Sequence, residues 1–199
     1  MVPPTEAPAA ATAGIDPEQV ERRLRERFPD VPFRRQQGEA VRDHTLFLPG
    51  DRLVEVCTFL RDDPELDFAL LAWVGGVDLL PSEPRFEVVY HLLSVSRNVR
   101  IALKVQLREA APNVPTVCGV WPTANWHERE TFDFYGIRFD GHPDLTRILL
   151  PDDWEGWPLR KDAPLGYQEV AFTHNTPGRT VPSPDLTTLK PKKVRYRAH

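Results

Sequence analysis

The sequence has very little cysteine, which limits the redox chemistry that the chain can carry. Cys57 and Cys118 are the two cysteines among its 199 residues. An iron–sulfur cluster normally takes four thiolates, and a structural zinc site needs paired ligands at short spacings. Neither can be assembled from two isolated cysteines, which are expected to be small buried apolar residues. We therefore expect no iron–sulfur cluster and no structural zinc site in this chain. The lack of catalytic motifs extends the expectation to no metal site, no cofactor site and no catalytic residue.

Long apolar runs and a strong net charge are also missing. The most apolar stretch, "FALLAWVGGV" from Phe68, is about half of the roughly 20 residues that a membrane-spanning helix needs. The net charge is -4 with both signs interspersed, which excludes the basic surface typical of nucleic-acid binding. No basic residue precedes Arg22, so we expect neither a secretory signal nor a transit peptide.

The common catalytic motifs are absent as well. Gly75 and Gly76 form an isolated pair, so the chain has no phosphate-binding or dinucleotide-binding glycine loop. No G-x-S-x-G nucleophile elbow occurs. The run "HERE" at 127–130 begins like a zinc-protease helix, but position 131 is Thr131 where the second histidine is required.

Proline is abundant and divides the chain into parts. The 21 prolines are about twice the average usage of about 5%. Residues 1–14, rich in proline and alanine, are predicted to be a mobile leader. Residues 151–199 are predicted to be an extended arm that binds a partner, because they lack periodicity yet keep Trp154 and Trp157. Its basic end, 190–199, could contact an acidic partner or stay solvated.

Residues 15–150 are predicted to form one α+β domain. Asp16, Pro17 and Gln19 are typical of a capped helix start, and Pro29 ends that helix. A strand is expected around 41–48. Asp51 is expected to cap a second helix. The buried face of that helix would hold Leu53, Val56, Cys57 and Leu60.

The clearest periodicity predicts a β-hairpin. Apolar residues alternate over 86–93 and again over 99–107. Further strands are expected in 67–74 and 115–121, and a helix over 124–135. Arg100, Lys104 and Gln106 would give the second hairpin strand one wet face. We thus expect a mixed, largely antiparallel sheet with helices mainly on one face.

The predicted helix contains an unusual run, "ERETFDFYGI", at 128–137. Gly136 would end the helix. Its aromatic side chains point to all sides, so every side should be covered by protein. Arg129 is expected to pair with Asp133 four residues on. Such pre-neutralised charges favour a structural role over a catalytic one.

Two chemical alternatives stay open at this stage. A two-carboxylate hydrolase could use Glu128 or Glu130 with Asp133, helped by His142. A metal could bind His142 with Asp140 and Asp144, although a capped loop histidine is the simpler interpretation.

Charged and aromatic residues also alternate in two loop segments, "LTRILLPDDWEG" and "PLRKDAP". Solvated loops seldom carry paired tryptophans, and tryptophan and arginine dominate interface hot spots. These segments are therefore predicted to press against a partner.

Residues 124–164, "ANWHERETFDFYGIRFDGHPDLTRILLPDDWEGWPLRKDAP", resemble the signature of the C subunit of bacterial NADH-quinone oxidoreductase, respiratory complex I. The spacing of that signature is unbroken, and residues 15–123 agree in their order of elements. Thr146 and Ala163 depart from the residues common in the family. These departures affect the local contacts expected at the two positions and not the assignment to the family. The signature positions are interface candidates: Glu128, Arg129, Glu130, Asp133, Tyr135, Gly136, His142, Pro143, Arg147, Asp153, Gly156, Pro158, Arg160, Lys161 and Asp162.

This resemblance implies a non-redox structural subunit of a proton-translocating complex. The chain would dock against the D subunit, which forms the quinone site with the B subunit, while flavin and iron–sulfur clusters lie in other subunits. It would be peripheral, on the cytoplasmic side of the cell membrane. The alternatives are the equivalent subunit of a related membrane-bound hydrogenase or of a dehydrogenase not using NADH, and, more remotely, a free-standing carboxylate or metal hydrolase.

Overall fold

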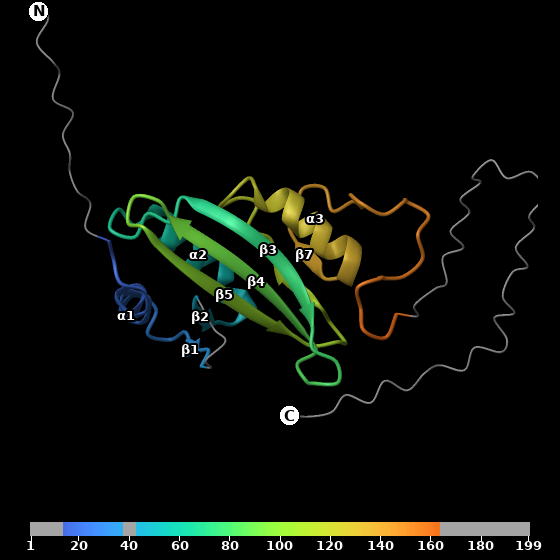
Figure 1. The fold of residues 1–199 in the computed structure, drawn as a ribbon, viewed down its shortest axis with the longest axis horizontal. Helices are drawn as coiled ribbons and strands as arrows, with labels where there is room; N and C mark the ends of the chain where they lie inside the picture. The colour runs from blue at the N-terminus through green and yellow to red at the C-terminus, as the bar shows by residue number, and fades with distance from the viewer. Residues whose placement is uncertain (1–13, 38–42, 164–199) are drawn as a thin grey trace, which may run out of the picture. The chain divides into compact units, whose positions relative to one another are not determined.

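The computed structural model describes residues 14–37 and 43–163, which build a layered α+β domain (Figure 1). Its elements in chain order are α1 (Pro17–Arg27), β1 (Arg34–Arg35), β2 (His44–Phe47), the short 3₁₀ helix η1 (Gly50–Arg52), α2 (Leu53–Asp62), β3 (Leu70–Asp78), β4 (Phe86–Ser94), β5 (Val99–Leu107), β6 (Asn113–Pro115), α3 (Ala124–Tyr135) and β7 (Arg138–Asp140).

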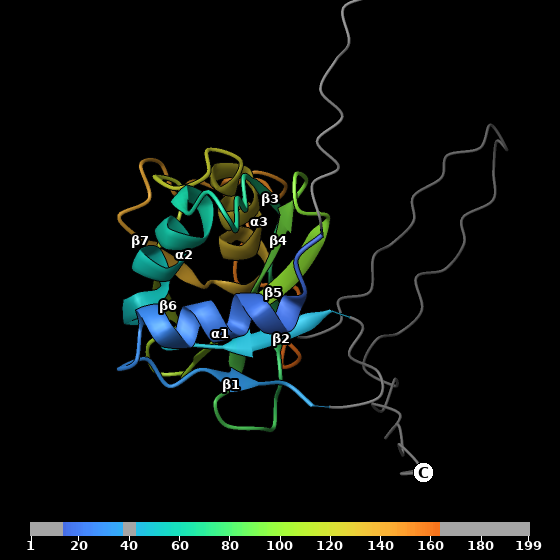
Figure 2. The same ribbon diagram turned by 90° about the vertical axis from the view of Figure 1, so that its left-hand side faces the viewer.

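The main sheet has five strands in the order β1-β2-β5-β4-β3. Its neighbours pair antiparallel except β2 and β5, which are parallel, and β6 and β7 form a separate parallel pair. The helices gather on one side of the sheet (Figure 2). This arrangement confirms the predicted α+β class and its mixed, largely antiparallel sheet.

The predicted hairpin forms from β4 and β5. β4 and β5 pair from Phe86 opposite Leu107 to Ser94 opposite Val99. The apolar set of each strand is buried in the core, whereas Arg100 and Gln106 on the other face of β5 are exposed. The wet face expected for β5 is therefore confirmed at Arg100 and Gln106, whereas Lys104 is half-buried beside Glu87.

The predicted N-terminal cap is confirmed for α1 but not for α2. Asp16 caps α1 in a full capping box with Gln19, as predicted. α2 buries the four expected residues, but it begins after η1, and Asp51 makes no capping hydrogen bond. The predicted cap was wrong because η1 supplies the first turn with its own backbone bonds, and Arg52 occupies the N-cap position.

The predicted strand at 115–121 was also wrong over most of its length. Strand β6 ends at Pro115, and the N–H groups of Val120 and Trp121 both donate to the carbonyl of Val117, which makes a tight turn. Short apolar runs do not distinguish a strand from a buried turn. The turn brings the backbone at 116–118 beneath α3, where it meets Glu128.

Some predictions fall outside the described residues. These are residues 1–13 of the leader, 41–42 at the start of the strand predicted around 41–48, and 164–199 with the basic end of the arm. The arm's first part, 151–163, forms turns. Within the described ranges, no helix has both the length and the apolar character needed to cross a bilayer.

Candidate functional site

The candidate site is built on α3 and on residues 143–163, a segment we call the strap. α3 ends at Gly136, whose φ is 69° and whose N–H donates to the carbonyl of Phe132 at 2.8 Å. A Cβ at position 136 would lie 2.5 Å from the ring of Trp157 in the strap. Glycine is therefore required both to stop the helix and to let the strap cross it.

The burial of α3 reverses the expected pattern. Its buried residues include Glu128, Thr131 and Asp133, whereas Trp126 is 61% exposed. Within the described residues the chain does not cover Trp126, so a cover for that side of the helix would have to come from elsewhere, and the expectation that every side is covered stays a prediction. The helix turns its carboxylates inward because backbone and side-chain donors are available there, and this leaves Trp126 at the surface.

Asp133 anchors the strap. Its Oδ2 accepts hydrogen bonds from the backbone N–H groups of Ile148, Leu149 and Leu150 at 3.1, 2.8 and 2.9 Å. Its Oδ1 accepts from the Arg147 guanidinium at 2.8 Å. Burial by itself would raise the pKa of Asp133, but these donors outweigh it and hold the pKa below its ordinary value. Three consecutive N–H groups around one carboxylate oxygen form an anion-binding nest.

Glu128 is buried just as deeply but has neutral donors. It accepts from the Thr116 hydroxyl, from the Val117 N–H at 2.8 Å and from the Cys118 thiol at 3.4 Å. His142 Nε2 lies 4.0 Å away. Burial raises the pKa of Glu128 despite these donors. The carboxylate joins α3 to the turn that follows β6.

Arg129 does not pair with Asp133, which corrects the prediction from i,i+4 spacing. Its guanidinium donates instead to the carbonyls of Thr146 and Arg147 at 3.1 and 2.9 Å, and it lies 5.4 Å from the ring centre of Trp126. Asp133 is paired with Arg147, fourteen residues along the chain. The strap thus supplies the backbone carbonyls that accept from Arg129, and its Arg147 is the cation that pairs with Asp133.

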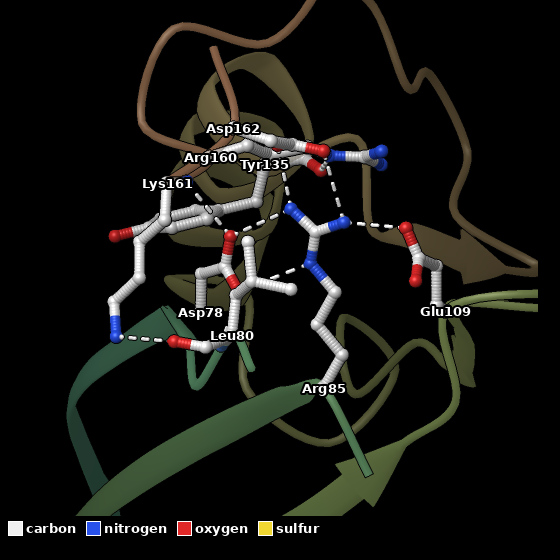
Figure 3. Close-up of polar contacts among 8 residues, drawn as sticks. All are labelled: Asp78, Leu80, Arg85, Glu109, Tyr135, Arg160, Lys161 and Asp162. Atoms are coloured by element: carbon white, nitrogen blue, oxygen red, sulfur yellow. Dashed lines mark hydrogen bonds and ion pairs between the residues drawn. The ribbon is translucent and has the colours of Figure 1, made fainter. Parts of the chain in front are cut away.

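A second charge cluster ties the end of the strap to the sheet (Figure 3). Arg85 is almost fully buried and donates to Asp78 from Nε and Nη2 at 3.1 and 2.9 Å. It also donates to Asp162 at 2.6 and 3.1 Å and to Glu109. Three carboxylates thus converge on one guanidinium that links β3, β4 and the strap.

Asp78 in this cluster is stabilised as an anion. Burial alone would raise the pKa of Asp78, but the Arg85 guanidinium and the N–H groups of Leu80 and Lys161 lower it to about 2. The backbone N–H of Lys161 donates to Asp78 at 2.8 Å, and the Lys161 ammonium donates to the Leu80 carbonyl at 3.1 Å (Figure 3). Lys161 is therefore fixed by both ends.

Arg160 and Trp157 complete the packing of the strap on α3. Arg160 donates to the carbonyl of Tyr135 at 2.7 Å and lies 5.0 Å from the ring centre of Phe86. Trp157 packs edge-on against Phe132 at 5.1 Å. The N–H of Leu159 donates to the Phe134 carbonyl. The last turn of α3 is thus capped by the strap.

The remaining signature residues lie at the surface or in turns. Pro143 and Asp153 are exposed, and Pro158 is half-buried. Gly156 has a φ of 83°, and its carbonyl accepts weakly from Arg147 at 3.5 Å. Glu130 is half-exposed at the edge of a groove between α3 and β3. The structure thus brings six of the fifteen signature residues into the Asp133, Arg85 and Arg160 contacts: Asp133, Tyr135, Arg147, Arg160, Lys161 and Asp162.

The geometry does not assemble the carboxylate pair of a hydrolase. Glu128 and Asp133 accept hydrogen bonds from two different segments, 116–118 and 147–150. Glu130 contacts neither set. His142 lies beside Glu128, with its Nε2 4.0 Å from that carboxylate and 3.4 Å from the Asn125 carbonyl, so it stands next to one carboxylate and not between a pair.

A metal site at His142 is disfavoured by the tautomer that its neighbours require. Cys118, Glu128 and His142 are close enough to hold an ion, with candidate ligand atoms within 4.8 Å. However, the Asp144 N–H donates to His142 Nδ1 at 3.1 Å, so the ring proton of the neutral imidazole sits on Nε2. A protonated nitrogen cannot bind a metal. The expected partner Asp140 instead accepts from Asn113.

Sequence reasoning missed Asp78, Arg85 and Thr116, which hold the strap and α3 in place. Arg85 precedes an apolar alternating run, and Asp78 follows one, so each is a charge at a strand end. A charged residue at the end of a strand is usually exposed, so this pattern did not predict that Asp78 and Arg85 are buried. Nothing in the sequence links them to Asp162, because their meeting depends on the path of the strap.

Comparison with known proteins agrees with this framework. The family model described as "Respiratory-chain NADH dehydrogenase, 30 Kd subunit" matches residues 46–169. The C subunit of NADH-quinone oxidoreductase from Roseiflexus sp. (strain RS-1) is 54% identical over 81% of this chain and 91% of its own length. The C subunit of the same enzyme from Herpetosiphon aurantiacus is 47% identical over 81% of this chain and 92% of its own length.

Two solved structures have similar folds. A trypsin-resistant fragment (1-134) of Nqo5 is 32% identical with a TM-score of 0.53, covering 64% of this chain and 98% of the fragment. A chain of the membrane-bound sulfane sulfur reductase, described as an archaeal respiratory membrane complex, is 26% identical with a TM-score of 0.62, covering 74% of this chain and 85% of that one. The region matched by the family model includes the buried carboxylates of α3 and their donors. This chain therefore belongs to the 30 kDa subunit family of respiratory-chain NADH dehydrogenase, the family of the NADH-quinone oxidoreductase C subunits.

Proposed function

We propose that the chain is a non-redox structural subunit of the proton-translocating NADH-quinone oxidoreductase. In this proposal it docks against the D subunit, which forms the quinone site, with the B subunit and other peripheral-arm subunits nearby. Electrons pass from NADH through flavin and iron–sulfur clusters in those other subunits to quinone. The names of the relatives support the complex, and the two cysteines of the sequence are too few for a cluster held by four thiolates.

One observation carries the docking role. Of the eight large apolar side chains that the described residues expose, six lie on β3, on α3 or in the strap: Leu70, Trp73, Trp126, Leu149, Trp154 and Leu159. These three elements are in contact, since α3 packs on β3 and the strap binds both. Apolar surface concentrated in this way marks a protein–protein contact. Tryptophan is the residue most enriched at interface hot spots.

The strap is suited to binding because its backbone is already ordered. The Asp133 nest fixes its middle, and the Arg85 cluster fixes its end. A segment that is held in its bound shape loses less conformational entropy when a partner covers it. The chain would then reach the membrane only through the complex, on its cytoplasmic side.

Co-purification tests the proposal. The tagged chain is expressed in cells that carry the complex and is recovered from gently solubilised membranes. Trp154→Glu, at a side chain that is 43% exposed in the strap, is expected to lower recovery of the D subunit at least about tenfold, as for an interface hot spot. Val95→Glu, in the turn between β4 and β5, is the matched control and should leave recovery unchanged. Recovery of both variants at the level of the unchanged chain would contradict the docking role.

The same preparation separates the related complexes. The likeness to a chain of the sulfane sulfur reductase calls for a test of the electron donor and acceptor. A recovered complex that contains flavin and reduces quinone with NADH supports the NADH-quinone oxidoreductase. A complex without that activity would favour the hydrogenase-like or non-NADH alternative. A chain recovered alone, with hydrolytic activity, would revive the hydrolase.

A further inference from the structure

A small groove between β3 and α3 is the most specific feature of the exposed region. Its volume is about 130 Å³, and its walls are Trp73, Phe134 and Leu159, with Glu130 at its edge. Pockets that enclose small ligands usually measure about 300–1,000 Å³, so this groove is too small for a cofactor. Its size suits one long side chain.

Two glycines of β3 create the groove. A Cβ at Gly75 would lie 2.0 Å from the ring of Trp73, and a Cβ at Gly76 would lie 2.8 Å from the ring of Tyr135. Any side chain at either position would push one of these rings out of place. The isolated glycine pair of the sequence thus forms the floor of the groove, and it allows Trp73 to lie flat on the strand.

The groove places one carboxylate beside apolar walls. Glu130 has no hydrogen bond or ion pair to any residue in the described ranges 14–37 and 43–163. Arg129 on α3 and Arg160 in the strap are both occupied by other acceptors. Arg129 donates to carbonyls of the strap, and Arg160 donates to the Tyr135 carbonyl. Within the described residues Glu130 therefore has no cationic partner, and a cation from outside them can pair with it.

We propose that this groove receives an arginine side chain of the partner subunit, an inference that rests on the docking role proposed above. A guanidinium can make two hydrogen bonds to the Glu130 carboxylate. It also stacks on aromatic faces and is more weakly hydrated than a lysine ammonium, which suits the indole of Trp73 and the side chain of Leu159. Charge complementarity at this point fixes the orientation of the two subunits.

Charge reversal at the groove tests this inference by the same co-purification. Glu130→Lys is expected to lower recovery of the partner at least about tenfold, because two cations would then face each other. Glu130→Gln, which keeps the shape and loses the charge, should cause a smaller loss. Glu26→Lys is the matched control, since Glu26 is exposed on α1 and makes no polar contact within the described residues. It should leave recovery unchanged.

Cross-linking identifies the occupant. A photo-reactive amino acid in place of Leu159 should form a product with a partner peptide that contains arginine. A product with residues 164–199 of this chain, or no change in recovery for Glu130→Lys, would overturn the inference while the docking role stands. If the unchanged chain fails to recover the complex, the docking role fails and this inference fails with it.

Discussion

Two buried carboxylates on one helix behave in opposite ways. Glu128 and Asp133 lie five positions apart on α3, and the side chains of both are fully shielded from solvent. The pKa of Glu128 is raised by burial, whereas the pKa of Asp133 is lowered despite burial. Asp133 has a guanidinium and three backbone N–H donors, and Glu128 has neutral donors with a histidine 4.0 Å away.

The difference shows that burial depth does not decide the charge of a carboxyl group. The decisive factor is how many donors point at the charged form and whether one of them is itself a cation. Asp133 therefore binds the strap as an anion, and its removal leaves Arg147 and a row of N–H groups without their acceptor. Glu128 binds the turn at 116–118 through neutral donors, so its hydrogen bonds depend much less on a negative charge.

The largest effect should come from Asp133→Ala. Removal of one partner of a buried ion pair typically destabilises a protein by about 3–5 kcal/mol. We expect a total loss in this range for Asp133→Ala, with the lost backbone N–H hydrogen bonds included. Urea denaturation of the full chain measures the free energy of unfolding, and limited proteolysis reports release of the strap. Asp153→Ala, at an exposed acid of the same strap, is the control and should unfold like the unchanged chain. A loss below about 1 kcal/mol for Asp133→Ala would mean that the nest does not hold the strap.

Thr116→Val should have a medium effect on the other side of the comparison. It removes a hydroxyl donor to Glu128 and leaves part of a buried carboxyl group unsatisfied, which costs about 1–3 kcal/mol. Thermal unfolding of the full chain at neutral pH would measure the loss. Thr123→Val, at an exposed threonine before α3, is the matched control. Equal stability of the two variants would show that Glu128 does not depend on this donor.

Glu128→Gln should change stability by less than about 1 kcal/mol at neutral pH, because the amide keeps an acceptor for the Val117 N–H and can donate to Thr116. The cost of a buried charge also disappears. Chemical denaturation compared with Asp133→Asn gives the sharpest form of the comparison, since both changes replace a carboxylate with an amide of the same size. If Glu128→Gln proved the more damaging of the two, the contrast between the two sites would be wrong.

The smallest effects should be opposite slopes of stability with pH. A lowered folded pKa gives Asp133 a stabilising contribution above its unfolded value, and that contribution is lost as pH falls toward the lowered pKa. A raised folded pKa makes Glu128 a cost that grows as pH rises above about 4.3, the ordinary glutamate value. Urea midpoints measured across pH should therefore flatten at the acid end for Asp133→Asn. For Glu128→Gln the urea midpoints should depend less on pH above the ordinary glutamate pKa. Identical plots of midpoint against pH for the two variants would contradict the pKa directions.

Local patterns in the sequence determined the elements that frame the site. The capping box fixed the start of α1, Gly136 fixed the end of α3, and strict alternation fixed the hairpin. Each of these features depends on neighbours within a few residues, so backbone propensity and period suffice to predict it. The family signature over 124–164 likewise needs no coordinates to be seen.

Only the tertiary structure decided which charges meet. Asp133 pairs with Arg147 and not with Arg129, and Arg85 joins Asp78 to Asp162, which lies 77 positions after Arg85. The turn at 117–121 replaced a predicted strand because its backbone must pass under Glu128. Such contacts depend on the path of the strap and of the loops, which residue periodicity does not encode. A buried charge is stabilised by whatever donor the completed fold brings to it.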